Sequence, residues 1–167
     1  MLIIFFFIIV FWILFAQDKV DSKLEDYESN EFPNYTSFSK AKFIEAVCAI
    51  GVNLCMIDKK DFGKKNIEIR KYIKKVYPKE IDVREELSNA IKYPKNTESV
   101  CWWLKHQTNN FDELEFILFC VHLVSIDGLV SAKEQSEIDR IAEYLGVANY
   151  EYQQYIDYVN KSYYSRE

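Results

Sequence analysis

Apolar residues along the chain recur mainly with helical spacing, and no stretch alternates apolar and polar residues as a β-strand between turns does. The clearest example runs from Ser131 to Gly146. Ser131 and Glu134 have the spacing of a capping box, and Gly146 can take the left-handed conformation that ends a helix. Between them, one face carries the apolar stripe Ile138, Ile141, Ala142 and Leu145. The pattern predicts a helix over 132–145 and an all-α fold.

Six further helices are predicted from the same periodicity and from the prolines between them. Pro78 and Pro94 end helical patterns, because proline lacks the N–H that an interior helical position needs. The predicted ranges are 40–57, 64–77, 83–92, 98–106, 110 or 111 to 124, and 150–163. The first and fifth are apolar on nearly every side, which is typical of a helix buried in a core or in lipid. We favour a core position for 40–57, since its uncharged part is shorter than the roughly 20 residues of a membrane span.

The N-terminal segment has no polar residue from Leu2 to Ala16. We favour a retained membrane anchor over a cleaved signal, because no basic residue precedes the apolar run and no small residue stands two positions before Ala16. As a helix, however, the run would rise only about 22 Å, short of the roughly 30 Å hydrocarbon core. A buried N-terminal helix is the third interpretation. The anchor residues would include Leu2, Phe6, Ile9, Trp12 and Phe15.

The chain divides into an anchor (1–17), an acidic linker (18–38) and a helical domain (39–167). Lys19 and Lys23 follow the apolar run, which favours a cytoplasmic or equivalent side for the domain. If residues 1–16 were cleaved, the domain would instead be secreted or periplasmic. The four cysteines have neither disulfide-scaffold nor zinc spacing and are interpreted as reduced core thiols.

The domain contains an internal repeat. A shift of 69 positions aligns 47–76 with 116–145 without a gap, and seven of the thirty pairs are identical. Asp58 falls on Asp127 in this alignment, whereas Lys65 falls on Glu134. The repeat units, about 43–77 and 112–146, would each comprise a buried helix, a loop that opens with aspartate and an amphipathic helix.

The second unit carries Asp127-Gly128-x-Val130-Ser131-x-x-Glu134, followed by Ile138, Ile141-Ala142 and Leu145-Gly146-Val147. This combination resembles the TerB-like domain family. The resemblance implies a helical bundle with an internal duplication, and acidic residues that bind a divalent cation. Ile126 departs from the family, which has a small residue there. The chain has no His-Pro-Asp motif, so the co-chaperone activity of some members is not carried over.

Asp127 and Glu134 are the candidate ligands for a divalent cation. Measured against an EF-hand loop they would occupy positions five and twelve, but Leu123 and Ser125 stand where the first two ligands belong. The competing interpretation is structural, with Asp127 in a turn and Glu134 in the capping box. No other cofactor is expected.

No catalytic set is recognisable. The sequence has no glycine-rich phosphate loop and no zinc spacing, and it therefore predicts neither an enzyme nor a small-molecule substrate. Of the two histidines, we expect His122 to be buried on its apolar helix and His106 to be exposed. The net charge of −5 argues against nucleic acid as a partner.

Two surfaces are candidate contacts. The helix over 64–77 has a basic face opposite its apolar stripe. We expect Lys65 to lie on this basic face as well. The face is interpreted as a solvated face, as a contact for anionic lipid or as a contact for an acidic partner, through Lys64, Lys71, Lys74 and Lys75. The last helix has more tyrosines than a core can satisfy. Those expected to face a partner are Tyr152, Tyr155 and Tyr163.

These features predict a membrane-tethered TerB-like module for protein interaction or scaffolding, whose partners are membrane lipid and other membrane-protein subunits. An accessory subunit of a larger membrane complex fits this description. The alternative is a stress or envelope protein that binds a divalent metal through Asp127 and Glu134.

Overall fold

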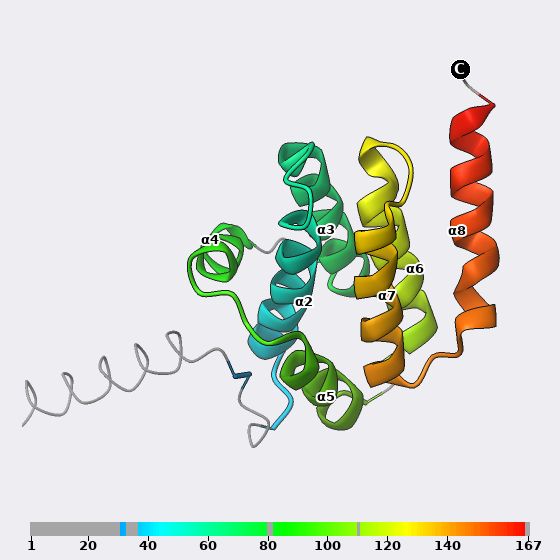
Figure 1. Ribbon diagram of the computed structural model, residues 1–167. Helices are drawn as coiled ribbons and strands as arrows, with labels where there is room; N and C mark the ends of the chain where they lie inside the picture. The colour runs from blue at the N-terminus through cyan, green and yellow to red at the C-terminus, as the bar shows by residue number, and fades with distance from the viewer. Residues whose placement is uncertain (1–30, 33–36, 80–81, 110, 166–167) are drawn as a thin grey trace, which may run out of the picture.

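The computed structural model describes residues 31–32, 37–79, 82–109 and 111–165. Within these ranges the chain forms seven α-helices and one 3₁₀ turn, with no strand (Figure 1), which confirms the all-α class. The elements are α2 (Lys40–Cys55), α3 (Phe62–Val76), α4 (Arg84–Lys92), α5 (Thr97–Gln107), α6 (Glu113–Val124), η1 (Ser125–Asp127), α7 (Ala132–Leu145) and α8 (Asn149–Tyr164). The predicted bounds of α7 are confirmed to the residue, and those of the other helices differ from the prediction by up to three residues.

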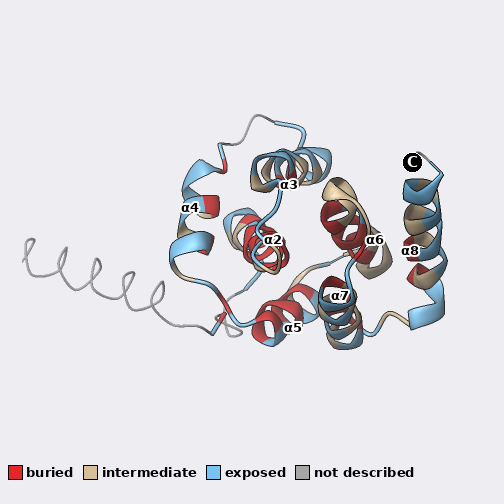
Figure 2. Cartoon of the chain, turned by 45° about the horizontal axis from the view of Figure 1, so that its top comes forward, coloured by how far each residue is buried: buried red, intermediate tan, exposed pale blue. Residues whose placement is uncertain are grey.

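Helix α2 is the centre of the core. It contacts α3, α4, α5 and α6, and Figure 2 shows it enclosed by neighbouring helices, with its buried residues on several sides. This explains why its sequence has almost no polar face. Gly51 allows α3 to pack closely, because a Cβ at this position would lie 2.7 Å from Cδ1 of Ile69. The prediction of a core helix over this stretch is therefore confirmed.

Two helix pairs make up the body of the domain. Helix α2 packs on α3 and helix α6 packs on α7, while α6 also contacts both α2 and α3. Helix α5 closes the base by packing against α2 and α7. The loops that connect α2 to α3 and α6 to α7 lie at the same end of the domain (Figure 1). A carboxylate from each loop contacts the ammonium of Lys65 on α3.

Helix α8 lies at the edge of the domain and packs chiefly against α6 (Figures 1 and 2). Only Tyr152 and Ile156 of this helix are buried. The Tyr152 hydroxyl donates a hydrogen bond to Oδ1 of Asp139 on α7 at 2.7 Å. Near the other end, the Asn160 side chain accepts a hydrogen bond from the backbone N–H of Val130 at 3.0 Å. These contacts fix the helix along one face and leave its outer face uncovered by the described chain.

The predicted linker is partly packed onto the domain. Phe32 is only 1% exposed, its ring lies edge-on to Trp103, and its backbone N–H donates to Oγ of Ser99 at 2.8 Å. The predicted anchor over 1–17 lies outside the described residues. Among the described residues, no helix combines the length and the apolar character needed to cross a membrane.

Candidate functional site: a buried lysine among three carboxylates

Lys65 is the most unusual residue of the described chain, because its ammonium group is buried in the protein. Its side chain is 0% exposed although it belongs to α3, whose other lysines face solvent. The expectation that Lys65 lies on the exposed basic face is wrong. A buried charge needs partners of opposite charge, since its hydration has been removed. The partners come from two loops that are far apart in the sequence.

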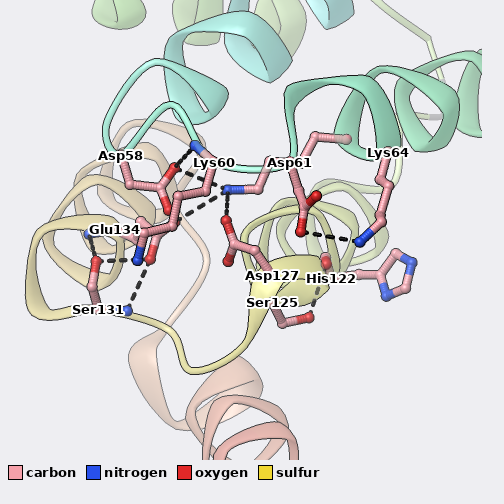
Figure 3. A network of polar contacts seen from close by, with 10 residues as sticks. Asp58, Lys60, Asp61, Lys64, His122, Ser125, Asp127, Ser131 and Glu134 are labelled. Atoms are coloured by element: carbon pink, nitrogen blue, oxygen red, sulfur yellow. Dashed lines mark hydrogen bonds and ion pairs between the residues drawn. The ribbon is translucent and has the colours of Figure 1, made fainter.

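Three carboxylates surround the ammonium. The distances from Nζ of Lys65 are 2.6 Å to Oδ2 of Asp127, 3.2 Å to Oδ1 of Asp58 and 3.6 Å to Oε1 of Glu134. Figure 3 shows Asp58 approaching from the loop before α3, Asp127 from the loop before α7, and Glu134 from α7 itself. We call these four residues the Lys65 cluster. It joins the two helix pairs at one end of the domain.

The first loop of the cluster contains a turn stabilised by Asp58 and two residues with left-handed backbone. Oδ1 of Asp58 accepts from the backbone N–H of Lys60 at 3.1 Å, which makes a local turn. Lys59 and Asp61 have φ values of 60° and 45°, a conformation that is unfavourable for residues with a Cβ. Helix α3 then begins without a side-chain cap.

The second loop is better formed. Gly128 has φ of 139°, which suits glycine, and Ser131 begins α7 with a complete capping box. Oε2 of Glu134 accepts from the backbone N–H of Ser131 at 2.9 Å and from its hydroxyl at 2.7 Å. The other oxygen, Oε1, faces Lys65. Glu134 therefore starts the helix with one oxygen and balances the lysine with the other, which explains its burial to 1% exposure.

The electrostatics of the cluster follow from burial and mutual proximity. Burial acts to lower the pKa of Lys65, but its interactions with Asp127 and Asp58 outweigh this and raise the pKa above its ordinary value. Burial, together with the adjacent carboxyl of Asp58, raises the pKa of Asp127 despite the nearby ammonium. The pKa of Asp58 is lowered, because hydrogen bonds from the Lys60 N–H and from its neighbours in the cluster outweigh its partial burial. The lysine is therefore charged at neutral pH.

The predicted metal ligands do lie together, but they enclose a lysine. Asp58, Asp127 and Glu134 each place one oxygen within 4.8 Å of the others, a spacing that would suit a divalent cation. Sequence reasoning included Asp127 and Glu134 and missed Asp58. The ammonium occupies the region between these oxygens, however, so a hard cation with several oxygen ligands does not fit while Lys65 is in place.

The tyrosines of α8 that were predicted to contact a partner are not the ones most exposed to solvent. Tyr152 does not face a partner, because it is 1% exposed and bonded to Asp139. Tyr155 is half-buried, and Tyr163 is 38% exposed with its ring near Gly128. The tyrosines of α8 that face solvent are Tyr150, Tyr158 and Tyr164, with exposures of 75%, 67% and 65%.

The basic face of α3 is partly neutralised by ion pairs. Lys64 pairs with Asp61 at 3.1 Å, Lys71 with Glu68 at 2.6 Å and Lys75 with Glu115 at 2.6 Å. Of the four predicted contact lysines, only Lys74 makes no ion pair with another described residue. The net positive charge that this face presents is therefore smaller than its sequence indicates.

His122 is also placed differently from expectation. Its side chain is 50% exposed, and Nε2 lies 3.5 Å from Oε2 of Glu68. It occupies the outer side of α6, and the apolar residues around it in the sequence face the other way. His106 is exposed, as predicted, and its ring nitrogen Nδ1 lies 2.8 Å from the carbonyl oxygen of Trp102.

All four cysteines are buried free thiols. Burial raises the pKa of Cys55 and Cys101 to about 12, and it also raises the pKa of Cys48 and Cys120 well above the ordinary thiol value. A thiol is nucleophilic as its thiolate. None of the four is therefore activated for covalent chemistry at neutral pH.

No family model, curated protein or solved structure matches this chain. The geometry of its surface and of the Lys65 cluster is therefore the basis for the function proposed below.

Proposed function

We propose that this protein is a membrane-tethered, non-enzymatic helical module of the TerB-like type that binds another protein through the outer face of α8. The observation that carries the proposal is the exposure of Tyr150, Tyr158 and Tyr164 along this one helix. Tyrosines are enriched in protein interfaces, since each combines a large apolar ring with a hydrogen-bonding hydroxyl. A helix that packs along one face only has its other face available for a partner.

The acidic charge of the C-terminal part of the chain indicates what kind of partner surface would fit α8. The chain from 112 to 167 has eleven acidic residues and four basic ones, and the outer face of α8 includes exposed Glu151 and Asp157. Complementary charge accelerates association and suppresses wrong partners. We therefore expect a partner with a positively charged face, most simply a subunit of the same membrane.

The TerB-like assignment is supported by the two loops. In both helix pairs an aspartate is the third residue after the first helix, and Asp58 and Asp127 meet at the same ammonium. The Ser131–Glu134 capping box, predicted from the spacing of these two residues, is present. A duplicated unit whose copies face each other would place these equivalent positions side by side.

The tether is proposed from the apolar run 2–16, and its test is fractionation of the full-length chain. We expect the chain to resist extraction from membranes at high pH, and the Phe6→Lys, Ile9→Lys double variant to be released. A matched control is the Lys19→Glu, Lys23→Glu double variant, which leaves the apolar run intact. A wild-type chain recovered in the soluble fraction, or shortened by cleavage near residue 16, would contradict the tether.

The interaction face is tested on the full-length chain in mild detergent with Tyr150, Tyr158 and Tyr164 changed to alanine. A protein that co-purifies with the wild type should be lost from this variant. It should be retained by the Ile67→Ala, Ile91→Ala variant, which alters exposed apolar residues on α3 and α4. Equal recovery of the protein with all three chains would reject the α8 face, and loss of self-association alone would identify a second copy as the occupant.

The basic face of α3 supports a weaker, secondary contact. Lys74 and Arg70 line a hollow between α3 and the start of α4, and basic residues near an anionic bilayer contribute about 1 kcal/mol each. The ion pairs of Lys64, Lys71 and Lys75 reduce the charge available for this attraction. We therefore place the principal contact on α8. The divalent-metal alternative is not retained, because the ammonium of Lys65 occupies the centre of the carboxylates.

A further inference from the structure

Two oxygens of the Lys65 cluster have no hydrogen-bond donor among the described residues, and Lys65 is the cation beside them. Oδ2 of Asp127 and Oε1 of Glu134 are buried and accept no hydrogen bond. Both lie close to Nζ of Lys65, at 2.6 Å and 3.6 Å. Buried carboxylate oxygens of this kind are strongly unfavourable without positive charge beside them. The ammonium is therefore what makes their burial tolerable.

The position of the ammonium is also the position that a metal ion would take. Calcium lies about 2.3–2.6 Å from its oxygen ligands and magnesium about 2.0–2.1 Å. An ion at such distances from three oxygens that lie within 4.8 Å of one another would fall in the space that Nζ occupies. An ion and an ammonium cannot share this space, because both are positive and their centres would nearly coincide.

The sequence alignment of the two units shows which residue stands at the position equivalent to Lys65. Lys65 aligns with Glu134, as Asp58 aligns with Asp127. If residue 65 were glutamate like its counterpart, the cluster would contain four carboxylates and no cation. Such a set could be buried only with a bound metal ion or with added protons. A single lysine removes one of these ligands and supplies the positive charge.

We infer that Lys65 is a built-in replacement for a divalent cation, so that this domain folds without metal and gains a calcium or magnesium site when Lys65 becomes glutamate. The inference does not depend on the protein-binding role proposed for α8, which lies on a different element. The spacing of the carboxylates by itself indicates a metal site. With Lys65 between them, they need no metal.

The test compares thermal unfolding of the full-length chain in mild detergent with chelator, with millimolar calcium and with millimolar magnesium. The wild type should unfold at one temperature in all three conditions. The Lys65→Glu variant should be destabilised in chelator, and its midpoint should rise with the logarithm of the ion concentration, as ligand binding to the folded state requires. Lys74→Glu makes the same charge change on the exposed face of α3 and should show no such dependence.

The outcomes separate clearly. A wild-type midpoint that rises with either ion would overturn the inference, because the carboxylates would then bind metal beside the lysine. A folded Lys65→Glu chain that is insensitive to both ions would overturn it as well. If Lys65→Glu is unfolded in chelator and folded with ion, the inference is supported. If Lys65→Glu is unfolded in all three conditions, the same measurement is made on Lys65→Gln. This variant keeps the three carboxylates and removes the ammonium. Stabilisation of that variant by calcium or magnesium supports the inference, and its absence rejects it.

Discussion

The loop between α2 and α3 and the loop between α6 and α7 have the same outline and opposite chemistry. Each has an aspartate as its third residue, Asp58 or Asp127, and seven residues further on the following helix carries Lys65 in α3 or Glu134 in α7. The second loop starts its helix with a capping box, whereas the first starts α3 without a side-chain cap. The two loops therefore make different contributions to the Lys65 cluster. The first loop and α3 contribute the cation and one carboxylate, and the second loop and α7 contribute the capping box and the other two carboxylates.

The largest expected effect is that of removing the cation. Lys65→Met should lower the free energy of unfolding by about 3–5 kcal/mol, because it leaves uncompensated buried carboxylates. The measurement is urea unfolding followed by circular dichroism, with Lys64→Met as the control on the exposed side of the same helix turn. Similar losses in the two variants would mean that the cluster contributes no more than a surface pair.

A charge exchange sharpens the comparison further. Glu134→Lys and Lys65→Glu should each destabilise the domain in chelator, and the double variant should recover most of the loss, since it restores one ammonium among three carboxylates. Recovery should be incomplete by about 1 kcal/mol, because the Glu134 half of the α7 capping box is lost while Ser131 still caps the helix. A double-mutant cycle by urea unfolding measures the coupling. Additive losses would show that the two positions do not interact.

The backbone of the two loops should also respond differently to substitution. Gly128→Ala should cost about 1–3 kcal/mol, because its φ of 139° disfavours a side chain, and the new Cβ would lie 3.2 Å from the Tyr163 ring. Lys59→Gly, at the aligned position with φ of 60°, should cause no loss of stability, since glycine adopts this conformation without steric strain. Thermal unfolding of both variants checks the contrast. Equal destabilisation would contradict it.

The smallest expected effect is the decline of the free energy of unfolding at alkaline pH. The folded pKa of Lys65 is raised because its interactions with Asp127 and Asp58 outweigh the effect of burial. The folded state therefore binds this proton more tightly than the unfolded chain does. Its stabilisation is complete below the ordinary lysine pKa of 10.5 and is lost as pH rises through the folded pKa. Unfolding free energies at neutral and alkaline pH should show a steeper decline in the wild type than in Lys65→Met. Parallel declines would remove Lys65 as the cause.

The sequence alone predicted much of the fold because its signals are local. The bounds of α7 follow from Ser131, Glu134 and Gly146, all within one helix and its ends. Similarly, α2 was assigned to the core because nearly every side of it is apolar, and a helix of that kind has to be enclosed.

The site was only partly predictable, because its contacts are long-range. A lysine on a basic helix face is normally exposed, and Lys65 is buried only because Asp127 and Glu134 arrive from positions 62 and 69 residues later in the chain. One available signal was the alignment of Lys65 with Glu134, since a residue that aligns with a buried helix-capping residue can itself be expected to be buried. Tyr152 and His122 were misplaced for a related reason. Helical periodicity shows which residues share a face, but it does not show which face a distant element covers.

The packing of Phe32 against Trp103 fixes where the folded domain begins in the chain. If the apolar run to residue 17 is the membrane anchor that we propose, the segment between anchor and domain is 18–31, or fourteen residues, and not the twenty-one of 18–38. A fully extended chain spans at most about 3.6 Å per residue. Phe32 can therefore stand no more than about 50 Å from the end of the anchor. The domain can sample only a shallow layer beside the bilayer, and any partner of α8 has to be reachable from within that layer.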